Sequence, residues 1–151
     1  MEKKALVTGA SEGIGAVFAR KLAKEGFVIT GVARNEEKLQ SLVREIGTRH
    51  NYIVADLSTE SGQKKVMSEL SGAHHYDLLI NNAGVGAVGK FLDIPLERQL
   101  RMLHLNCAAV VNLSHAFLKN SKSGDALINV SSPWHLCLCL PSAFIVRQRP
   151  L

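Results

Sequence analysis

Short apolar runs alternate along this chain with longer segments in which apolar residues recur at intervals of three and four. The short runs have the length of buried strands, and the longer segments have the period of helices with one buried face. Strands are therefore predicted over residues 5–7, 27–32, 52–55, 77–80 and 126–130. Helices are predicted over residues 14–25, 36–46, 63–70 and 95–118. The alternation predicts an α/β fold, with a doubly wound parallel sheet of about five strands.

Residues that start and stop helices agree with these limits. Asn35 can cap the second helix, and Gly26 and Gly47 follow the first and second helices, where glycine ends a helix most easily. Pro95 stands in the first turn of the last helix, where a missing N–H costs nothing. We find no internal repeat and no linker, so the chain is interpreted as one domain over residues 1–132, followed by an atypical tail over residues 133–151.

Length and composition agree with a globular protein. The chain has 151 residues, of which 46% are hydrophobic and 21% charged, and this excludes a disordered polypeptide. The net charge of +5 would suit an anionic ligand. The charges are scattered without blocks or interleaved aromatic residues, which argues against a nucleic-acid partner.

The cysteines and the ends of the chain give no sign of a metal or a membrane. Three cysteines form no zinc-type spacing, and the sequence His135-x-Cys137-x-Cys139 is better explained by free thiols in an apolar stretch than by metal ligands. No signal peptide is visible, and the apolar run 136–146 is shorter than the roughly 20 residues that a membrane helix needs. We therefore expect a cytoplasmic protein without a membrane partner.

A glycine-rich turn, with the sequence VTGASEGIGA, joins the first predicted strand to the first predicted helix. Glycine permits a tight turn, a close approach of phosphate to the backbone, and close packing of helix on sheet. The helix that begins here directs unpaired N–H groups at a bound anion. This position predicts a dinucleotide site rather than an ordinary turn. The predicted cofactor-binding residues of the turn are Gly9, Ser11, Glu12, Gly13, Ile14 and Gly15.

The end of the second strand bears on the choice of cofactor. An acid there would bind the ribose hydroxyl of NAD, but this chain has Ala33 and Arg34. Arg34 can pair with the 2′-phosphate of NADP, so NADP is predicted in preference to NAD. The alternative is a solvated arginine at a helix start. Glu12 argues mildly against NADP, because an acid in the glycine turn adds no affinity for phosphate.

Further motifs follow the glycine turn in order: Asp56-Leu57, the segment Asn81-Asn82-Ala83-Gly84, Asn106 in the long helix, and Asn129-Val130-Ser131-Ser132. Together with the turn, this series over about residues 3–132 resembles the short-chain dehydrogenase/reductase family. The resemblance implies a Rossmann-like fold and hydride transfer between a nicotinamide cofactor and a small carbonyl or alcohol substrate.

The same resemblance implies a role for each motif. Asp56 and Leu57 would contact the adenine ring, and the segment Asn82, Ala83, Gly84 would lie along the cofactor. Asn106 would hold a water molecule of the proton relay, although it can also be a satisfied helix asparagine. Ser132 would polarise the substrate carbonyl, unless Ser131 is the hydroxyl that faces the substrate.

The catalytic tyrosine and lysine of the family, spaced Y-x-x-x-K on one helix face, are missing from this sequence. Ile145 stands where the tyrosine is expected, and no lysine follows Lys122. We therefore expect a fold truncated at its C-terminal side, with a fifth strand that lacks its next neighbour unless the tail or another chain covers it. A frameshift, truncation or splicing event would explain the atypical tail.

Two functions remain open at this point. The first is an NADP-dependent oxidoreductase with little or no activity in the present chain. The alternative is a non-catalytic fragment that binds NADP, or that pairs with a full-length relative through the long helix at 95–118.

Overall fold

The computed structural model describes residues 2–131 and the backbone of residues 144–147. The strands are β1 (Lys4–Thr8), β2 (Val28–Ala33), β3 (Asn51–Val54), β4 (Leu78–Asn81), β5 (Ala126–Asn129) and β6 (Phe144–Arg147). The helices are α1 (Gly13–Lys24), α2 (Glu36–Ile46), α3 (Glu60–Leu70), α4 (Leu96–Leu103) and α5 (Ala109–Lys119), with a 3-10 turn, η1 (Phe91–Asp93), and a π-helical segment, η2 (His104–Ala108). The predicted alternation of strands and helices is confirmed.

The strands form one sheet in the order β3-β2-β1-β4-β5-β6. The first five are parallel, as the sequence predicts. The sequence predicts that β5 lacks a neighbour unless the tail or another chain covers it. The tail does so, because β6 pairs with β5 in the antiparallel direction. Ile145, at the position where a tyrosine is expected, pairs with Ile128 in this register. The division into a domain and a tail at residue 132 stays a prediction.

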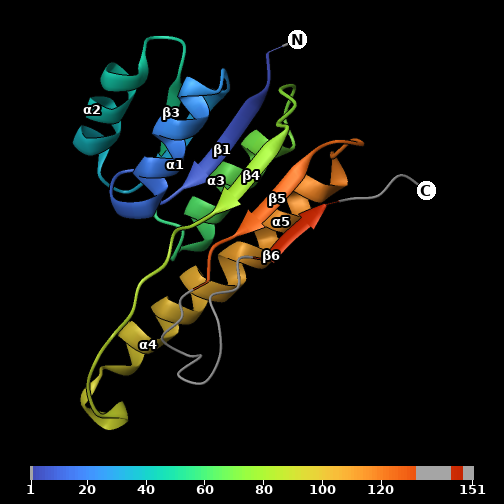
Figure 1. Cartoon of the computed structure of the whole chain (residues 1–151). Helices are drawn as coiled ribbons and strands as arrows, with labels where there is room; N and C mark the ends of the chain where they lie inside the picture. The colour runs from blue at the N-terminus through green and yellow to red at the C-terminus, as the bar shows by residue number, and fades with distance from the viewer. Residues whose placement is uncertain (1, 132–143, 148–151) are drawn as a thin grey trace.

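Helices cover the sheet from two sides, as Figure 1 shows. Alternate side chains of a strand enter different cores, because successive residues point to opposite faces. Leu6 of β1 packs with α3 and α5, represented by Val66 and Leu113. Val7 packs in the other core with Leu39 of α2 and with α1. This is the doubly wound arrangement that the sequence predicts.

Local capping explains where the helices begin and end. The side chain of Asn35 accepts a hydrogen bond from Lys38 N at 2.9 Å and starts α2, as predicted. Gly26, with φ of 92°, follows the end of α1. The third helix begins three residues earlier than predicted, because the hydroxyl of Thr59 accepts from Gly62 N at 3.1 Å and caps it.

The long helix predicted over residues 95–118 is continuous but not regular. A π-helical segment, η2, separates α4 from α5. The α4 end projects away from the sheet in Figure 1. Among the described residues, no helix has the length and hydrophobicity needed to cross a membrane.

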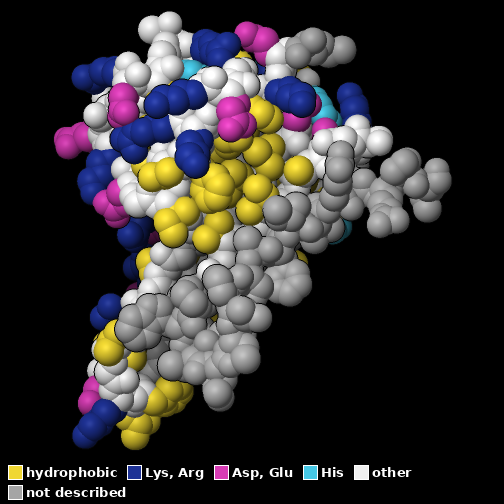
Figure 2. Space-filling model, in the orientation of Figure 1, with side chains coloured by type: hydrophobic (Ala, Val, Ile, Leu, Met, Phe, Trp, Pro, Cys, Tyr) yellow, Lys and Arg dark blue, Asp and Glu magenta, His cyan; other side chains and the backbone are white. Residues whose placement is uncertain are grey.

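One face of the sheet carries apolar side chains that are only partly covered. Ala126, Ile128 and Val130 are only partly buried, although they join the core beneath α1 and α2. Figure 2 shows hydrophobic side chains gathered over this part of the sheet. Within the described residues, the helices on this side pack against β1, β2 and β3.

Candidate cofactor-binding site

The glycine turn lies at the carboxyl edge of the sheet, between β1 and α1. Gly9 and Gly13 have φ of 67° and 57°, a conformation that favours glycine. A methyl group at Gly15 would lie 2.2 Å from the Gly9 carbonyl oxygen and 2.5 Å from Nδ2 of Asn82. Gly15 therefore permits α1 to pack directly on the turn, as the sequence suggests.

The start of α1 differs from the starts of α2 and α3. Those helices have side-chain caps, whereas Glu12 at the N-cap of α1 forms no such hydrogen bond. The first N–H groups of α1 are thus left available to an external acceptor. Ile14 is 61% exposed beside them, and Ser11 is half-buried. The arrangement suits an anion in contact with the helix start.

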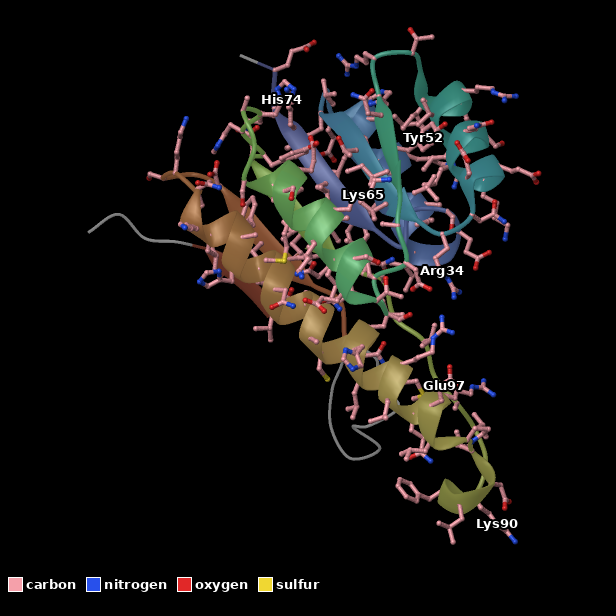
Figure 3. The ribbon with its side chains drawn as sticks, turned by 180° about the vertical axis from the view of Figure 1, so that it is seen from behind. Arg34, Tyr52, Lys65, His74, Lys90 and Glu97 are labelled. Atoms are coloured by element: carbon pink, nitrogen blue, oxygen red, sulfur yellow. The ribbon has the colours of Figure 1, made fainter. Side chains whose placement is uncertain are left out.

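Two cations follow β2 at the same edge. Arg34 is exposed, and its guanidinium forms no hydrogen bond or ion pair with the part of the chain that the structure describes. Figure 3 shows its side chain beyond the end of the strand. Lys38, in the first turn of α2, forms an ion pair with Glu12. This hydrogen-bonded cation lowers the pKa of the Glu12 carboxyl below its usual value.

Asp56 and Leu57 follow β3, the neighbour of β2. Leu57 is buried, and Oδ1 of Asp56 accepts hydrogen bonds from the backbone and hydroxyl of Ser58 at 2.9 and 2.7 Å. Its Oδ2 accepts from Arg101 of α4 at 3.1 Å. Burial opposes ionisation of Asp56, but the hydrogen bonds from Ser58 and the charges of Arg34 and Arg101 outweigh it, so the pKa is lowered. Asp56 is therefore held as a carboxylate.

The segment after β4 packs against the glycine turn. The side chain of Asn82 donates to the carbonyl of Thr8 at 3.0 Å, and Ala83 N donates to the Thr8 hydroxyl at the same distance. Gly84 is exposed. The predicted residues Asn82 and Ala83 thus lie next to the glycine turn, from which they are separated by about seventy positions in the sequence. Gly84 lies beside Asn106.

Asn106 lies in the π-helical segment and is tied to Val85. Its Nδ2 donates to the Val85 carbonyl at 2.8 Å, and its Oδ1 accepts from Val85 N at 3.0 Å. A π-helical turn widens the helix locally and is frequent at functional sites. Both side-chain groups of Asn106 therefore fix the segment that follows β4. Its role in holding a water molecule stays a prediction.

The predicted catalytic serine lies outside the described residues. The structure does not describe Ser132, whereas the alternative, Ser131, is exposed two positions after the end of β5. The carboxyl end of β5 is next to that of β4, so Ser131 lies at the same edge as the glycine turn.

Sequence reasoning missed four residues that shape the site. A Cβ at Gly62 would lie 2.0 Å from the Asp56 carbonyl oxygen, and glycine avoids this collision. Gln63 is buried and donates to the carbonyls of Leu57 and His104, at 2.9 and 3.3 Å. The other two are Lys38 and Arg101, described above. No local pattern signals these residues, since each acts on a partner from another element.

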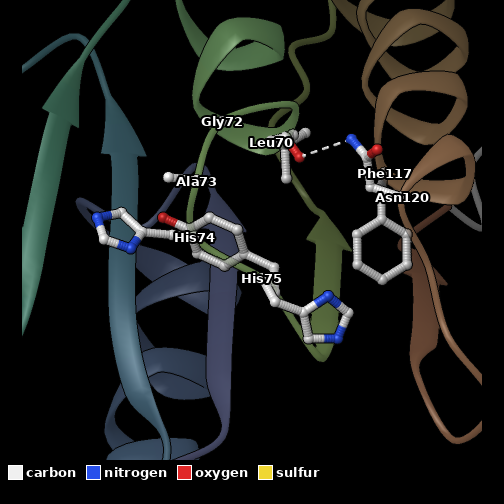
Figure 4. A pocket seen from close by; sticks show the side chains of 8 residues that line it. Leu70, Gly72, Ala73, His74, His75, Phe117 and Asn120 are labelled. Atoms are coloured by element: carbon white, nitrogen blue, oxygen red, sulfur yellow. Dashed lines mark hydrogen bonds between the residues drawn. The ribbon is translucent and has the colours of Figure 1, made fainter.

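A small cavity of about 140 Å³ lies at the opposite, amino edge of the sheet. Figure 4 shows its lining, with Asn120 donating to the carbonyl of Leu70 at 3.3 Å. His75, which also lines it, lies 3.1 Å from the Asp125 carboxylate. The strands are parallel, so this cavity is separated from the glycine turn by the length of the sheet.

Comparisons with known proteins agree with this geometry. The model of the short chain dehydrogenase family matches residues 3–135. Serine 3-dehydrogenase of Rhizobium radiobacter is 31% identical over 130 residues, which are 84% of this chain and 52% of that protein. The uncharacterized oxidoreductase YvaG of Bacillus subtilis is 36% identical over 124 residues, which are 78% of this chain and 46% of that protein. The chain spans about half the length of these relatives.

Solved structures of short-chain dehydrogenases superpose on this chain. The short-chain dehydrogenase of Sphingobium yanoikuyae, in complex with NADPH, superposes with a TM-score of 0.84 at 28% identity, covering 89% of this chain and 56% of that one. A short-chain dehydrogenase of Burkholderia cenocepacia, in complex with NADP, gives 0.83 at 28% identity, covering 92% and 59%. The sheet order, the glycine turn and these similarities together show that the chain belongs to the short-chain dehydrogenase family.

Proposed function

We propose that this chain binds NADP at the carboxyl edge of its sheet and is part of an oxidoreductase that acts on a small carbonyl or alcohol. The observation that carries the proposal is the guanidinium of Arg34, which has no hydrogen bond or ion pair among the described residues and lies at the same sheet edge as the uncapped start of α1. Both features fit the phosphate groups of NADP. Two similar structures contain NADP or NADPH, which supports this choice.

Each element of the site has a place in this proposal. The N–H groups at the start of α1 bind the pyrophosphate, and Arg34 binds the 2′-phosphate. Leu57 and the fixed carboxylate of Asp56 contact the adenine, and the backbone of residues 82–84 lies along the rest of the cofactor. NADP supplies the hydride chemistry when bound. Ser132 or Ser131 orients the substrate carbonyl.

We further propose that this polypeptide of 151 residues has little turnover by itself. Neither of its tyrosines, Tyr52 and Tyr76, suits the role of proton donor at the site. Tyr76 is buried, and its hydroxyl is engaged by Thr30 at 3.0 Å and Glu69 at 2.7 Å. Tyr52 lies in β3, and its hydroxyl donates to Glu36 of α2 at 3.1 Å. Loss of a general acid typically lowers the rate by about 10²- to 10⁴-fold.

The long helix supports the alternative function, association with another chain. Leu96, Leu100, Leu103 and Val111 are exposed by 68%, 47%, 58% and 66%. Successive members of this set are four, three and eight residues apart, which places them on one stripe of the helix surface. An exposed apolar stripe of this kind marks an interaction site. We propose that it binds a second copy of this chain or a full-length relative.

A thermal-shift experiment tests cofactor binding. NADP at about 100 times its Kd should stabilise the chain by about 2.7 kcal/mol. Arg34→Met should abolish most of the preference for NADP over NAD without changing the melting temperature of the free protein. No shift with either dinucleotide would refute the proposal. Oxidation of NADPH with a panel of carbonyl compounds measures turnover, and a normal rate would contradict the expected loss.

Light scattering after size exclusion tests association. The unmodified chain should elute as a dimer, and Leu100→Glu should give a monomer with an unchanged circular dichroism spectrum. A monomer that shows no pairing with a full-length relative would contradict this part of the proposal.

A further inference from the structure

Glu12 and Lys38 join two turns that lie side by side at the carboxyl edge. Glu12 precedes α1 in the glycine turn, and Lys38 lies in the first turn of α2, beyond Arg34. The two turns are adjacent because β1 and β2 pair in parallel, with Thr8 opposite Val32. The carboxylate of Glu12 accepts a hydrogen bond from Nζ of Lys38. The carboxylate of Glu12 therefore pairs with a cation, Lys38, that lies next to the predicted position of the 2′-phosphate.

We propose that Lys38 is a second cation for the 2′-phosphate, and that Glu12 holds it until the phosphate replaces the Glu12 carboxylate. This inference rests on the proposed function and adds to it a specificity device that Arg34 alone does not provide. Glu12 then acts as an internal competitor, so that a ligand without a 2′-phosphate does not recruit Lys38.

The exposure of the pair supports this exchange. The side chains of Lys38 and Glu12 are 51% and 71% exposed, so each can leave the other for water or a ligand. Exposed ion pairs are weak, and exchanging a partner costs little. The backbone of Lys38 is meanwhile fixed, because its N–H donates to the cap residue Asn35 at 2.9 Å. The ammonium group of Lys38 can therefore change partners while the backbone at the start of α2 stays in place.

Charge also favours the exchange. A phosphate monoester carries about −1.5 to −2 charges at pH 7, and Glu12 carries one negative charge. The nearby acid Glu36 does not occupy the same position, because its carboxylate accepts from Tyr52 at 3.1 Å and from Gln40 at 3.4 Å. The phosphate would therefore face Arg34 and Lys38 together, with Glu12 displaced.

Half-molecule ligands test the proposal without the nicotinamide. We would measure by calorimetry the binding of adenosine 2′,5′-bisphosphate and of adenosine 5′-monophosphate to the full chain. Lys38→Met should weaken binding of the bisphosphate about tenfold and leave the monophosphate unchanged. Lys38→Arg should retain most of the affinity. Glu12→Gln should tighten binding of the bisphosphate about threefold, because the competitor is lost.

A matched control is Lys64→Met. Lys64 forms a comparable exposed ion pair with Glu60 on α3, and its loss should change neither affinity. Equal weakening of both ligands in Lys38→Met, or an unchanged affinity for the bisphosphate, would overturn the inference. So would weaker binding of the bisphosphate in Glu12→Gln. If the unmodified chain bound neither NADP nor either probe, the proposed function would fail as well; if it bound NADP and Lys38→Met bound it equally, the inference alone would fail.

Discussion

The side chain of Asn82 donates a hydrogen bond to the backbone carbonyl of Thr8 at 3.0 Å, across 74 positions of the sequence. The Thr8 hydroxyl completes the link, because it accepts from Asn82 N at 2.9 Å and from Ala83 N at 3.0 Å. Thr8 is 1% exposed. These bonds hold the glycine turn and the segment after β4 in one arrangement, on which the proposed cofactor site depends.

Replacement of Thr8 by valine should therefore destabilise the protein. Valine keeps the shape of threonine but leaves two N–H groups without their acceptor, and we expect a loss of about 2–3 kcal/mol in the free energy of unfolding. Urea denaturation measures this loss. Thr8→Ser keeps the hydroxyl and should lose much less. A loss in Thr8→Ser as large as that in Thr8→Val would show that the methyl group contributes as much as the hydrogen bonds.

Gly15→Ala should disrupt the site more than a glycine substitution that adds only backbone strain. Its methyl group would collide with the Gly9 carbonyl and Asn82. We expect a destabilisation of about 1–3 kcal/mol and loss of the thermal shift with NADP. Gly124→Ala is the control, since Gly124 has φ of 100° but open space around it. It should cost about 1–2 kcal/mol and leave the shift intact. A retained shift in Gly15→Ala would contradict the packing argument.

His50 should make stability depend on pH. Burial, with a further contribution from the charge of Arg49, lowers the pKa of His50 below its usual 6.5. Its Nδ1 accepts from Ile29 N at 3.0 Å, which requires the neutral ring. The unfolded chain takes up the proton more readily, so the free energy of unfolding should fall as pH decreases below about 6.5. Above that value the contribution is complete.

Denaturation at pH 7.5 and pH 5.5 measures this effect. His50→Asn retains an acceptor and cannot be protonated in this range, so its stability should decrease less between the two values. An identical decrease in both proteins would assign the pH dependence to other groups.

Tyr76→Phe should destabilise the protein without affecting cofactor binding. The buried hydroxyl bonds with Thr30 and Glu69, and its loss leaves the hydroxyl of Thr30 without this partner. We expect a loss of about 1–2 kcal/mol. Tyr52→Phe removes hydrogen bonds that are more exposed to solvent, so the free energy of unfolding should decrease less in this variant. Weaker NADP binding in Tyr76→Phe would show that the two edges of the sheet are coupled.

The order of elements could be predicted from the sequence because strands and helices bury side chains with different periods. The glycine turn was equally visible, since its place between an apolar run and a helical pattern is a local property. Asn35 and Gly26 marked helix limits for the same reason. The third helix was predicted too short, because the capping by Thr59 was overlooked.

Contacts between distant elements were decided by the tertiary structure. Nothing near Lys38 in the sequence indicates that it meets Glu12, and nothing near Arg101 indicates that it meets Asp56. The sequence left open whether the tail covers β5, and the tertiary structure decided that residues 144–147 pair with it in the antiparallel direction. The sequence by itself determined the sheet, its helices and the glycine turn, because these follow from local periodicity. Only the tertiary structure decided which charges share an edge, because parallel strands bring together turns that lie far apart along the chain.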